Sequence, residues 1–168
     1  MKEELAQRLV RCLKETGIDF ITYLPESRLS QMLPLVEADA AFSVIPVASE
    51  AEGITIAAGA TLGGKQAACY LESSGLFVAG FSLLTIGKQL GVPVLLVVGF
   101  LGDAADQRNS FLYATVGQST IPFLEGLGIE YIRIESGEGM ETKIKDGVRM
   151  MNALRCPVAL LFSGEFTE

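Results

Sequence analysis

Histidine is absent from this chain of 168 residues. The chain can therefore form no His-ligated metal site, no Ser-His-Asp or Cys-His nucleophile system and no histidine proton shuttle. Any chemistry must rest on carboxylates, hydroxyls and backbone amides, or on a cofactor that brings its own reactivity.

Cysteine is scarce, and positive charge is not clustered. Cys12, Cys69 and Cys156 are far apart and form no CxxC pair, a usage typical of a cytosolic protein with reduced thiols. The formal net charge of −7 argues against a nucleic-acid surface. No apolar run reaches the roughly 18 uncharged residues that a membrane span needs, and the first 17 residues are patterned as an amphipathic helix rather than a signal peptide. We expect a cytoplasmic protein that binds neither nucleic acid nor membrane.

The common phosphate-binding loops are missing as well. The chain has no GxGxxG, GxxxxGK[ST] or GxSxG motif, and "GATLGGK" lacks the Ser or Thr that would follow a Walker lysine. What the chain has in excess is apolar character, with 49% hydrophobic residues and a mean hydropathy of +0.39. We expect part of this excess to lie in a subunit interface.

Helical and strand patterns alternate along the chain. The expected strands are 18–24, 41–48 (ending at Pro46), 66–72, 92–100, 130–135 and 157–163. The expected helices are 3–16, 25–37 (interrupted by Pro34), 50–62, part of 73–90 after a loop, 119–127 and 139–154, with an irregular stretch before 119. Nearly continuous apolar strands separated by helices are typical of a parallel sheet buried on both faces. The sequence predicts one α/β domain over residues 1–168: a doubly wound, mostly parallel six-stranded sheet with helices on both faces.

In such sheets ligands bind outside the carboxyl ends of the strands. The candidate site loops are therefore 24–28, 47–52, 72–80 and 99–118. Fold class alone does not decide what is bound there.

Two glutamates at the start of the 50–62 helix receive different interpretations. Ser49 and Glu52 form a capping box, in which Ser49 caps the first turn and Glu52 reaches back to the Ser49 amide. The capping box gives Glu52 a structural role, whereas no such role accounts for Glu50. The rest of the helix is small or apolar, so we expect it to be buried nearly all round, with Gly53 and Gly59 marking close approach of a backbone or ligand. A carboxylate in such a place needs a partner, although acids are also common as surface residues in a first helical turn.

The segment "PVASEAEGITIAAGATLGGKQA" resembles the glutamate-bearing helix of the pyrimidine (PYR) domain of thiamine-diphosphate enzymes. In that family an acid lies nine residues before a helical glycine, and nine residues before Gly59 is Glu50. "GIDFITYLPESRLSQMLPLVE", "ESSGLFVAG" and "GVPVLLVVGFLGD" are similar to segments of the phosphonopyruvate and sulfopyruvate decarboxylases. The resemblance extends over residues 1 to about 165 and is greatest to the separate α subunits of that family.

The resemblance implies a catalytic role for Glu50. In the family this acid hydrogen-bonds the cofactor's aminopyrimidine and promotes the imino form that removes the thiazolium C2 proton, after which a 2-oxo acid is decarboxylated. Cofactor-binding positions carried over by the resemblance are Glu50, Pro25, Ser73, Ser74 and Gly75.

The family's pyrophosphate (PP) domain holds Mg²⁺ and the diphosphate with a Gly-Asp-Gly…Asn signature, which this chain lacks. The resemblance therefore implies that thiamine diphosphate is shared with a PP-domain (β) subunit that holds the Mg²⁺, in a hetero-oligomer. No metal ligand is expected in this chain.

Departures from the family pattern concern the substrate. Phe77 and Val78 stand where the family has Gly-Asn, and Leu101 stands where it has an arginine. These three residues and Arg108 are the candidate substrate residues, with Arg108 or Arg28 as possible replacements for the missing cation. We expect a 2-oxo acid whose distal end is less anionic than in the family, or whose anion is bound by the partner.

Three alternatives remain open on the sequence. The chain is also compatible with a subunit of a thiamine-diphosphate carboligase, with a non-catalytic PYR-like module that binds a partner, and with an unrelated flavodoxin-like module. The buried acid Glu50 argues against the second. The third would need a glycine-containing phosphate loop after the first strand, where the chain has "YLPESRL".

Overall fold

The computed structural model describes residues 1–102 and 111–166. Its six strands form one sheet in the order β2-β1-β3-β4-β6-β5, and each neighbouring pair is parallel. The strands are β1 (Phe20–Tyr23), β2 (Ser43–Pro46), β3 (Ala67–Glu72), β4 (Leu95–Gly99), β5 (Glu130–Ile134) and β6 (Val158–Phe162). The predicted parallel α/β sheet is confirmed, and Pro46, which has no N–H to donate, ends its strand as expected.

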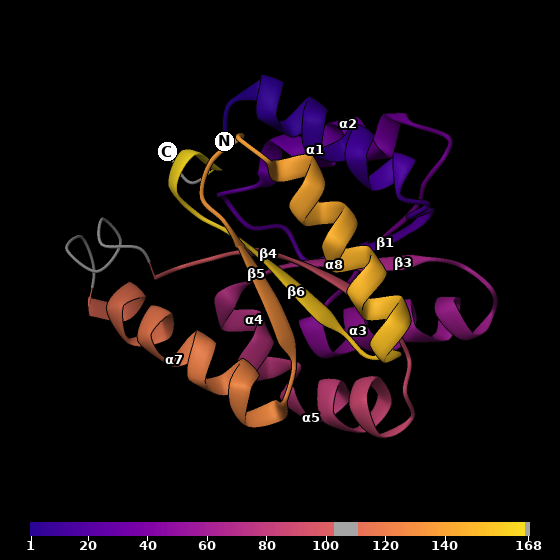
Figure 1. The fold of residues 1–168 in the computed structure, drawn as a ribbon, viewed down its shortest axis with the longest axis vertical. Helices are drawn as coiled ribbons and strands as arrows, with labels where there is room; N and C mark the ends of the chain where they lie inside the picture. Colours follow the sequence, from indigo (N-terminus) through magenta and orange to yellow (C-terminus); the bar gives the residue numbers. More distant parts are fainter. Residues whose placement is uncertain (103–110, 167–168) are drawn as a thin grey trace.

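Helices cover both faces of this sheet (Figure 1). One layer consists of α1 (Glu3–Glu15), the short η1 (Ser30–Met32), α2 (Leu33–Ala38), α8 (Met140–Leu154) and η3 (Gly164–Phe166). The other consists of α3 (Glu50–Leu62), α4 (Ser73–Val78), α5 (Gly80–Ser82), η2 (Leu83–Gln89) and α7 (Phe111–Leu127).

Two apolar cores result, because successive side chains of a strand point to opposite faces. In β3, Ala68 and Tyr70 belong to the core beneath α1 and α8, whereas Cys69 and Leu71 belong to the core beneath α3 and α7. The central strand β4 and its neighbour β6 are buried at every position. This explains why these strands read as continuous apolar runs.

Three boundaries differ from the sequence-based expectation. Pro34 does not interrupt a helix but lies in the first turn of α2, where its missing N–H has no intrahelical partner to lose. No loop separates β3 from the next helix, since α4 begins at Ser73. Helix α7 begins at Phe111 instead of 119 and contains Pro122.

The expectation that α3 is buried nearly all round is wrong for this chain. Ile54, Ala57 and Ala58 are fully buried, but Leu62 is 71% exposed. Gly53 is close to the Cys69 sulfur and to Val47, as its glycine character suggested, whereas a Cβ on Gly59 would meet nothing within 4 Å. One side of α3 therefore faces outward.

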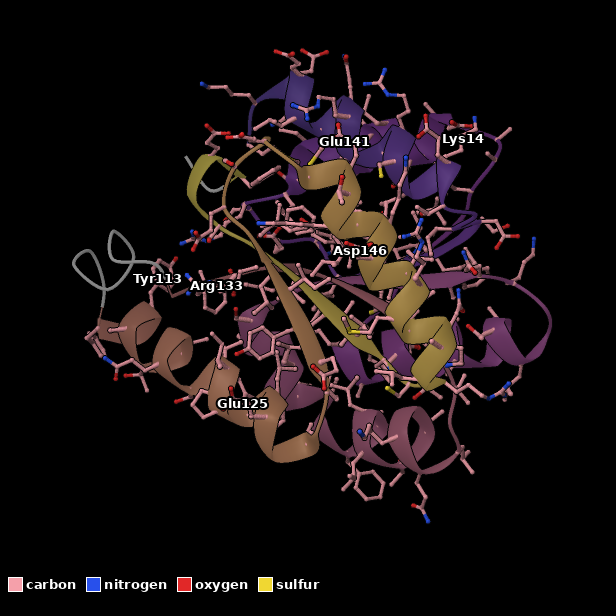
Figure 2. All side chains as sticks on the ribbon, in the orientation of Figure 1. Lys14, Tyr113, Glu125, Arg133, Glu141 and Asp146 are labelled. Carbon is pink, nitrogen blue, oxygen red and sulfur yellow. The ribbon has the colours of Figure 1, made fainter. Side chains whose placement is uncertain are left out.

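Helices α1 and α8 are joined by side-chain contacts on one face of the sheet. The Arg8 guanidinium on α1 donates from Nε to Glu141 Oε1 at 2.8 Å, and Glu141 lies in the first turn of α8 (Figure 2). A second nitrogen of Arg8 donates to the Gly137 carbonyl at 2.7 Å. These contacts hold α1 and α8 together in the layer that covers this face of the sheet.

Candidate active site at the carboxyl edge of the sheet

The strand order reverses between β1 and β3. The chain runs from β1 to β2 on one side and returns to β3 on the other side of β1. Such a reversal opens a crevice outside the carboxyl ends of the two strands, where ligands bind in open α/β sheets. The segments that leave β1 (24–28) and β3 (72–75) meet there, and α3 starts beside them.

Glu50 is the first residue of α3 and is half-buried. Gly75 lies directly against it, since a Cβ on Gly75 would come within 2.6 Å of Glu50 Oε1. In the part of the chain that the structure describes, the Glu50 carboxylate has no hydrogen-bond or ion-pair partner. The fold thus holds a carboxylate at a helix N-terminus, packed against backbone on one side and without a partner on the other.

Glu52, two residues later, is exposed and has a capping function. Ser49 Oγ accepts a hydrogen bond from the Glu52 N–H at 3.3 Å, as predicted for a capping box. The return bond was predicted to the wrong amide: Glu52 Oε2 accepts from Ala48 N at 2.7 Å rather than from Ser49 N. The extended backbone of Ser49 explains this, because it leaves the preceding amide within reach of the side chain.

Glu26 is a site residue to which the sequence analysis assigned no role. Its carboxylate accepts from the backbone N–H groups of Arg28 and Leu29, both at 2.6 Å, and from the buried Tyr70 hydroxyl. A Cβ on Gly99 would lie 3.0 Å from its Cδ, so Glu26 lies across the ends of β3 and β4. Burial, together with the Glu26 charge, raises the pKa of Tyr70 above its ordinary value, which keeps the phenol a donor. Glu26 fixes the loop after β1 to the carboxyl edge.

Ser73, a predicted cofactor-binding residue, is buried and joins β3 to β4. Its hydroxyl donates to the Gly99 carbonyl at 3.4 Å and accepts from the Leu101 N–H at 3.0 Å. Leu101, a candidate substrate residue, is only 1% exposed, so its side chain is not presented to the crevice surface in this chain. The structure thus brings Ser73 and Leu101 together, and their hydrogen bond joins the end of β3 to the residues after β4.

Glu72, the last residue of β3, is a second carboxyl that the sequence analysis did not single out. It is half-buried, and Ser74 Oγ donates to its Oε2 at 2.9 Å. Burial raises the pKa of Glu72 above its ordinary value, and the charges of Glu26 and Glu50 add to the increase, while Ser74 and Arg28 oppose it. The sequence feature that could have indicated a site role for Glu72 is its position at the end of a buried apolar strand.

The remaining predicted residues lie around this center. Pro25 is exposed in the loop after β1. Phe77 stacks against Phe123 of α7, with ring centroids 4.8 Å apart, and Val78 is 59% exposed. Arg108 lies outside the described residues. Arg28, in the loop after β1, has its Cζ 5.5 Å from the ring of Tyr113, a residue near the start of α7 (Figure 2).

Comparison with known families identifies this arrangement. The family model described as the thiamine pyrophosphate enzyme, N-terminal TPP binding domain, matches residues 3–119. The chain belongs to this family. The match includes Glu26, Glu50 and Glu72, so the three carboxyl groups all lie within the TPP binding domain.

Several curated relatives match the chain over much of its length. The sulfopyruvate decarboxylase subunit alpha of Methanococcus maripaludis is 29% identical over 97% of this chain and 96% of its own length. The protein of the same name from Methanothermobacter thermautotrophicus is 31% identical over 78% of each chain. Among solved structures, the 2-oxoglutarate:ferredoxin oxidoreductase of Magnetococcus marinus has a TM-score of 0.74 at 17% identity, covering 99% of this chain and 29% of that one. This last likeness concerns the fold alone.

The residues present fit one end of a thiamine cofactor. Glu50 is a half-buried carboxylate that packs on a glycine and has no polar partner in the described part of the chain, which suits it to hydrogen-bond a ring nitrogen. Within residues 1–102 and 111–166, no group of three or more Cys, Asp or Glu side chains is arranged to hold a metal ion. The residues of this chain therefore fit the aminopyrimidine end of the cofactor.

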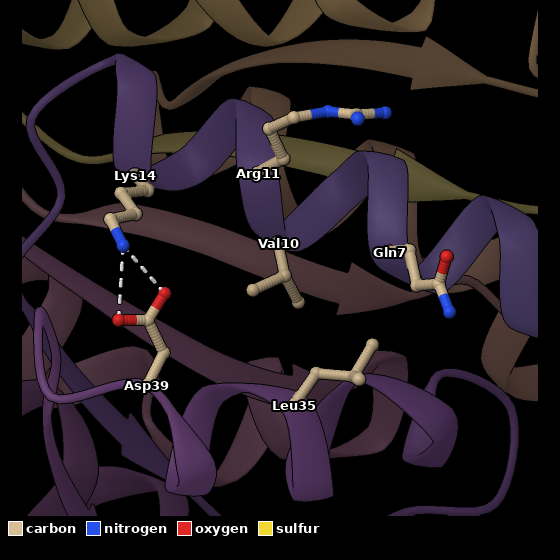
Figure 3. Close-up of a pocket in the computed structure, with 6 residues that line it drawn as sticks. All are labelled: Gln7, Val10, Arg11, Lys14, Leu35 and Asp39. Carbon is tan, nitrogen blue, oxygen red and sulfur yellow. Dashed lines mark hydrogen bonds and ion pairs between the residues drawn. The ribbon is translucent and has the colours of Figure 1, made fainter.

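A surface cavity of about 300 Å³ lies elsewhere, between α1 and α2 (Figure 3). The Lys14–Asp39 ion pair, with Nζ and Oδ2 2.8 Å apart, borders one end of it. Its lining comes from α1, α2 and the residue after α2, and not from the loops at the carboxyl edge. Over the described ranges, no helix combines the length and the apolar character that crossing a bilayer requires.

Proposed function

We propose that this chain is the PYR subunit of a two-chain, thiamine-diphosphate-dependent 2-oxo acid decarboxylase. The observation that carries the proposal is Glu50: a half-buried carboxylate at the N-terminus of α3, packed against Gly75 and without a hydrogen-bond or ion-pair partner among the described residues. A degenerate module that only bound a partner would have no reason to keep a half-buried acid in this position. The family and the decarboxylase α subunits among the relatives support the same assignment.

Glu50 has the environment that its proposed role requires. The N-terminus of α3 stabilises the anionic form of the carboxylate, whereas partial burial favours the protonated form. A group between these influences is suited to share a proton with a ring nitrogen. We propose that Glu50 binds the aminopyrimidine, that Gly75 leaves the space for it, and that Ser74 and Pro25 border the same crevice. When bound, thiamine diphosphate supplies the electron sink into which the bond to the carboxylate carbon breaks.

The Mg²⁺ and diphosphate anchor is proposed to come from a second subunit. This chain has no Gly-Asp-Gly…Asn signature, so it offers nothing of that kind for the charged end of the cofactor. The site would then be completed at an interface, with Glu50 from this chain meeting a cofactor anchored on a PP-domain partner. Exposed apolar side chains gather on α4, α5, η2 and the residue after η2, as expected of a chain that binds a partner subunit. These side chains are Phe77, Val78, Phe81, Leu84 and Leu90.

The proposed substrate is a 2-oxo acid. The relatives named sulfopyruvate decarboxylase favour a substrate with a distal anion. Against a strongly anionic group stand apolar Phe77 and Val78 and the buried Leu101, because a desolvated anion without a cation loses several kcal/mol. The anion would therefore be weaker than sulfonate or be bound by the partner or by a cation from a neighbouring loop.

The test is reconstitution with a PP-domain subunit. We expect neither chain alone to release carbon dioxide, and the mixture with thiamine diphosphate and Mg²⁺ to decarboxylate at least one of sulfopyruvate, phosphonopyruvate, pyruvate or a longer 2-oxo acid. Calorimetry on this chain alone with Mg²⁺ should detect weak cofactor binding or none. Micromolar binding without a partner would contradict the shared site, and an inactive mixture with every substrate would contradict the decarboxylase assignment.

A further inference from the structure

The segment 72–75 is fixed on both sides of the proposed active site. Glu72 pairs with Gly99 in the β3–β4 ladder. Ser73 then bonds to the backbone at the end of β4, and Gly75 packs against Glu50. These contacts hold the backbone of Glu72 at the carboxyl end of β3, three residues before the glycine that packs on Glu50. Its half-buried carboxyl group lies at the strand reversal, where ligands are expected.

The hydrogen bonds at this edge are distributed unequally. Three donors converge on Glu26, namely two backbone N–H groups and the Tyr70 hydroxyl. Within residues 1–102 and 111–166, Glu72 accepts a hydrogen bond from the Ser74 hydroxyl alone. The charged groups whose fields act on Glu72 are Glu26 from the loop after β1, Arg28 from the same loop and Glu50 from α3. Partial burial and the two neighbouring carboxylates disfavour a negative charge on Glu72 and outweigh the opposing Ser74 hydroxyl and Arg28, so Glu72 is a carboxyl placed to hold a proton.

The proposed reaction needs such a proton. The bond between the carboxylate carbon and the carbonyl carbon breaks, carbon dioxide leaves, and one proton takes its place on the former carbonyl carbon. The chain has no histidine to supply that proton. Glu50 is committed to the cofactor ring, and the Glu26 oxygens are occupied by loop donors.

We propose that Glu72 is a second catalytic carboxyl of this site and donates the proton that replaces carbon dioxide on the substrate. The carboxyl proton passes to carbon, and the resulting carboxylate recovers a proton from solvent, so the cycle consumes one proton for each carbon dioxide released. This assignment rests on the proposed decarboxylase function. It adds a role for Glu72 that the contacts of Glu50 do not supply.

The first test uses the full chain without cofactor. Carbon-13 NMR of the glutamate carboxyl groups, assigned by comparison with Glu72→Gln, should give a Glu72 titration midpoint above the ordinary glutamate value of about 4.3. In Glu50→Gln the midpoint should fall, because a neighbouring negative charge is removed. Glu52→Gln is the matched control and should leave it unchanged. A Glu72 midpoint at the ordinary glutamate value that does not change in Glu50→Gln would overturn the proposal. This holds whether or not the reconstituted complex is active.

The second test uses the reconstituted complex. Glu72→Gln should lower kcat by about 100-fold, in the range of general acid catalysis, with little change in KM. Glu72→Asp, which keeps the acid, should recover part of the rate, and the pH profile of kcat should lose the limb that Glu72 provides. A Glu72→Gln complex with wild-type kcat and pH profile would overturn the role of Glu72 alone. Inactivity of the wild-type complex on every 2-oxo acid would instead overturn the proposed function.

Discussion

At the scale of single residues, environment separates carboxyl groups that look equivalent in the sequence. Glu50 and Glu52 lie in the same helical turn, yet Glu52 bonds to the Ala48 amide in an exposed cap while Glu50 packs on Gly75. Glu26 is held by backbone amides, and Glu72 by one hydroxyl. Four glutamates at one edge of the sheet thus have different environments: Glu52 is a helix cap, Glu26 anchors a loop, and Glu50 and Glu72 have the proposed roles of cofactor contact and proton donor.

The first prediction compares the two glutamates of α3. Glu50→Gln should leave folding and partner assembly intact but slow exchange of the cofactor C2 proton by orders of magnitude, because an amide cannot share the proton. Glu52→Gln should cost at most about 1 kcal/mol of unfolding free energy through the cap and leave exchange nearly unchanged. Proton NMR of the reconstituted complex in D₂O measures the exchange. Equal effects of the two substitutions would show that Glu50 is wrongly assigned.

The second prediction concerns stability and Glu72. Because its folded pKa is raised, the folded state binds this proton more tightly than the unfolded state, and stability falls as pH rises from the ordinary glutamate pKa through the folded one. Glu72→Gln removes this loss and should raise stability at pH 7. The gain should be small, because the group is half-exposed and solvent screens its interactions.

Urea unfolding of wild type and Glu72→Gln between pH 4 and pH 8 checks this. The two unfolding free energies should diverge as pH rises, with the variant the more stable. A variant that is less stable at pH 7 would mean that the Glu72 carboxylate supports the fold. Its half-burial would then have a structural cause.

At the scale of elements, the position of helix α7 depends on close contacts at glycine residues. Helix α7 packs on the residues after β4 through Gly117, where a Cβ would overlap the Leu101 carbonyl and lie 3.0 Å from Gly102 N. Gly80 similarly accommodates the Phe123 ring of α7, at 2.8 Å from its would-be Cβ. Gly117 therefore sets the distance between α7 and the residues after β4, and Gly80 sets the distance between α7 and α5. The spacing of apolar residues in the sequence predicts neither contact.

The third prediction uses two glycines of the same helix. Gly117→Ala should destabilise the chain by about 1–3 kcal/mol, because α7 must shift away from the end of β4. Gly126→Ala is the control, since nothing lies within 4 Å of its would-be Cβ, and it should stabilise by up to about 1 kcal/mol through helix propensity. Thermal unfolding of both variants measures the difference. Equal effects would contradict the close approach at Gly117.

At the scale of the whole molecule, two cores enclose the sheet and bury all three cysteines. Cys12 lies in the core beneath α1, Cys69 in the core beneath α3, and Cys156 is buried next to the start of β6. Burial raises the pKa of Cys12 to about 11 and that of Cys69 to about 12, and it also raises the pKa of Cys156. The reactive thiolate is therefore disfavoured at all three positions.

The fourth prediction follows from this burial. N-ethylmaleimide at pH 7.5 should modify the folded chain slowly at all three cysteines, because alkylation requires an accessible thiolate. Labelling in denaturant should be fast and complete, which provides the control for reagent and thiol state. Mass spectrometry after timed quenching measures both rates. Rapid labelling of one cysteine in the folded chain would show that the core around it opens readily.

The sequence alone determined the parallel sheet and the capping role of Glu52, and it left Glu50 as the acid without a structural explanation. Strands β3, β4 and β6 are apolar at nearly every position because both faces are covered, and that pattern is local in the chain. The Ser49 cap likewise depends on neighbours within a few residues, which is why Glu50 and Glu52 could be separated without coordinates. Only the tertiary structure decided the start of α7, the exposed side of α3 and the convergence of Glu26, Glu50 and Glu72. These features depend on segments distant in sequence meeting at one edge, through close contacts such as Gly75 on Glu50 and hydrogen bonds such as Tyr70 to Glu26, which no periodicity encodes.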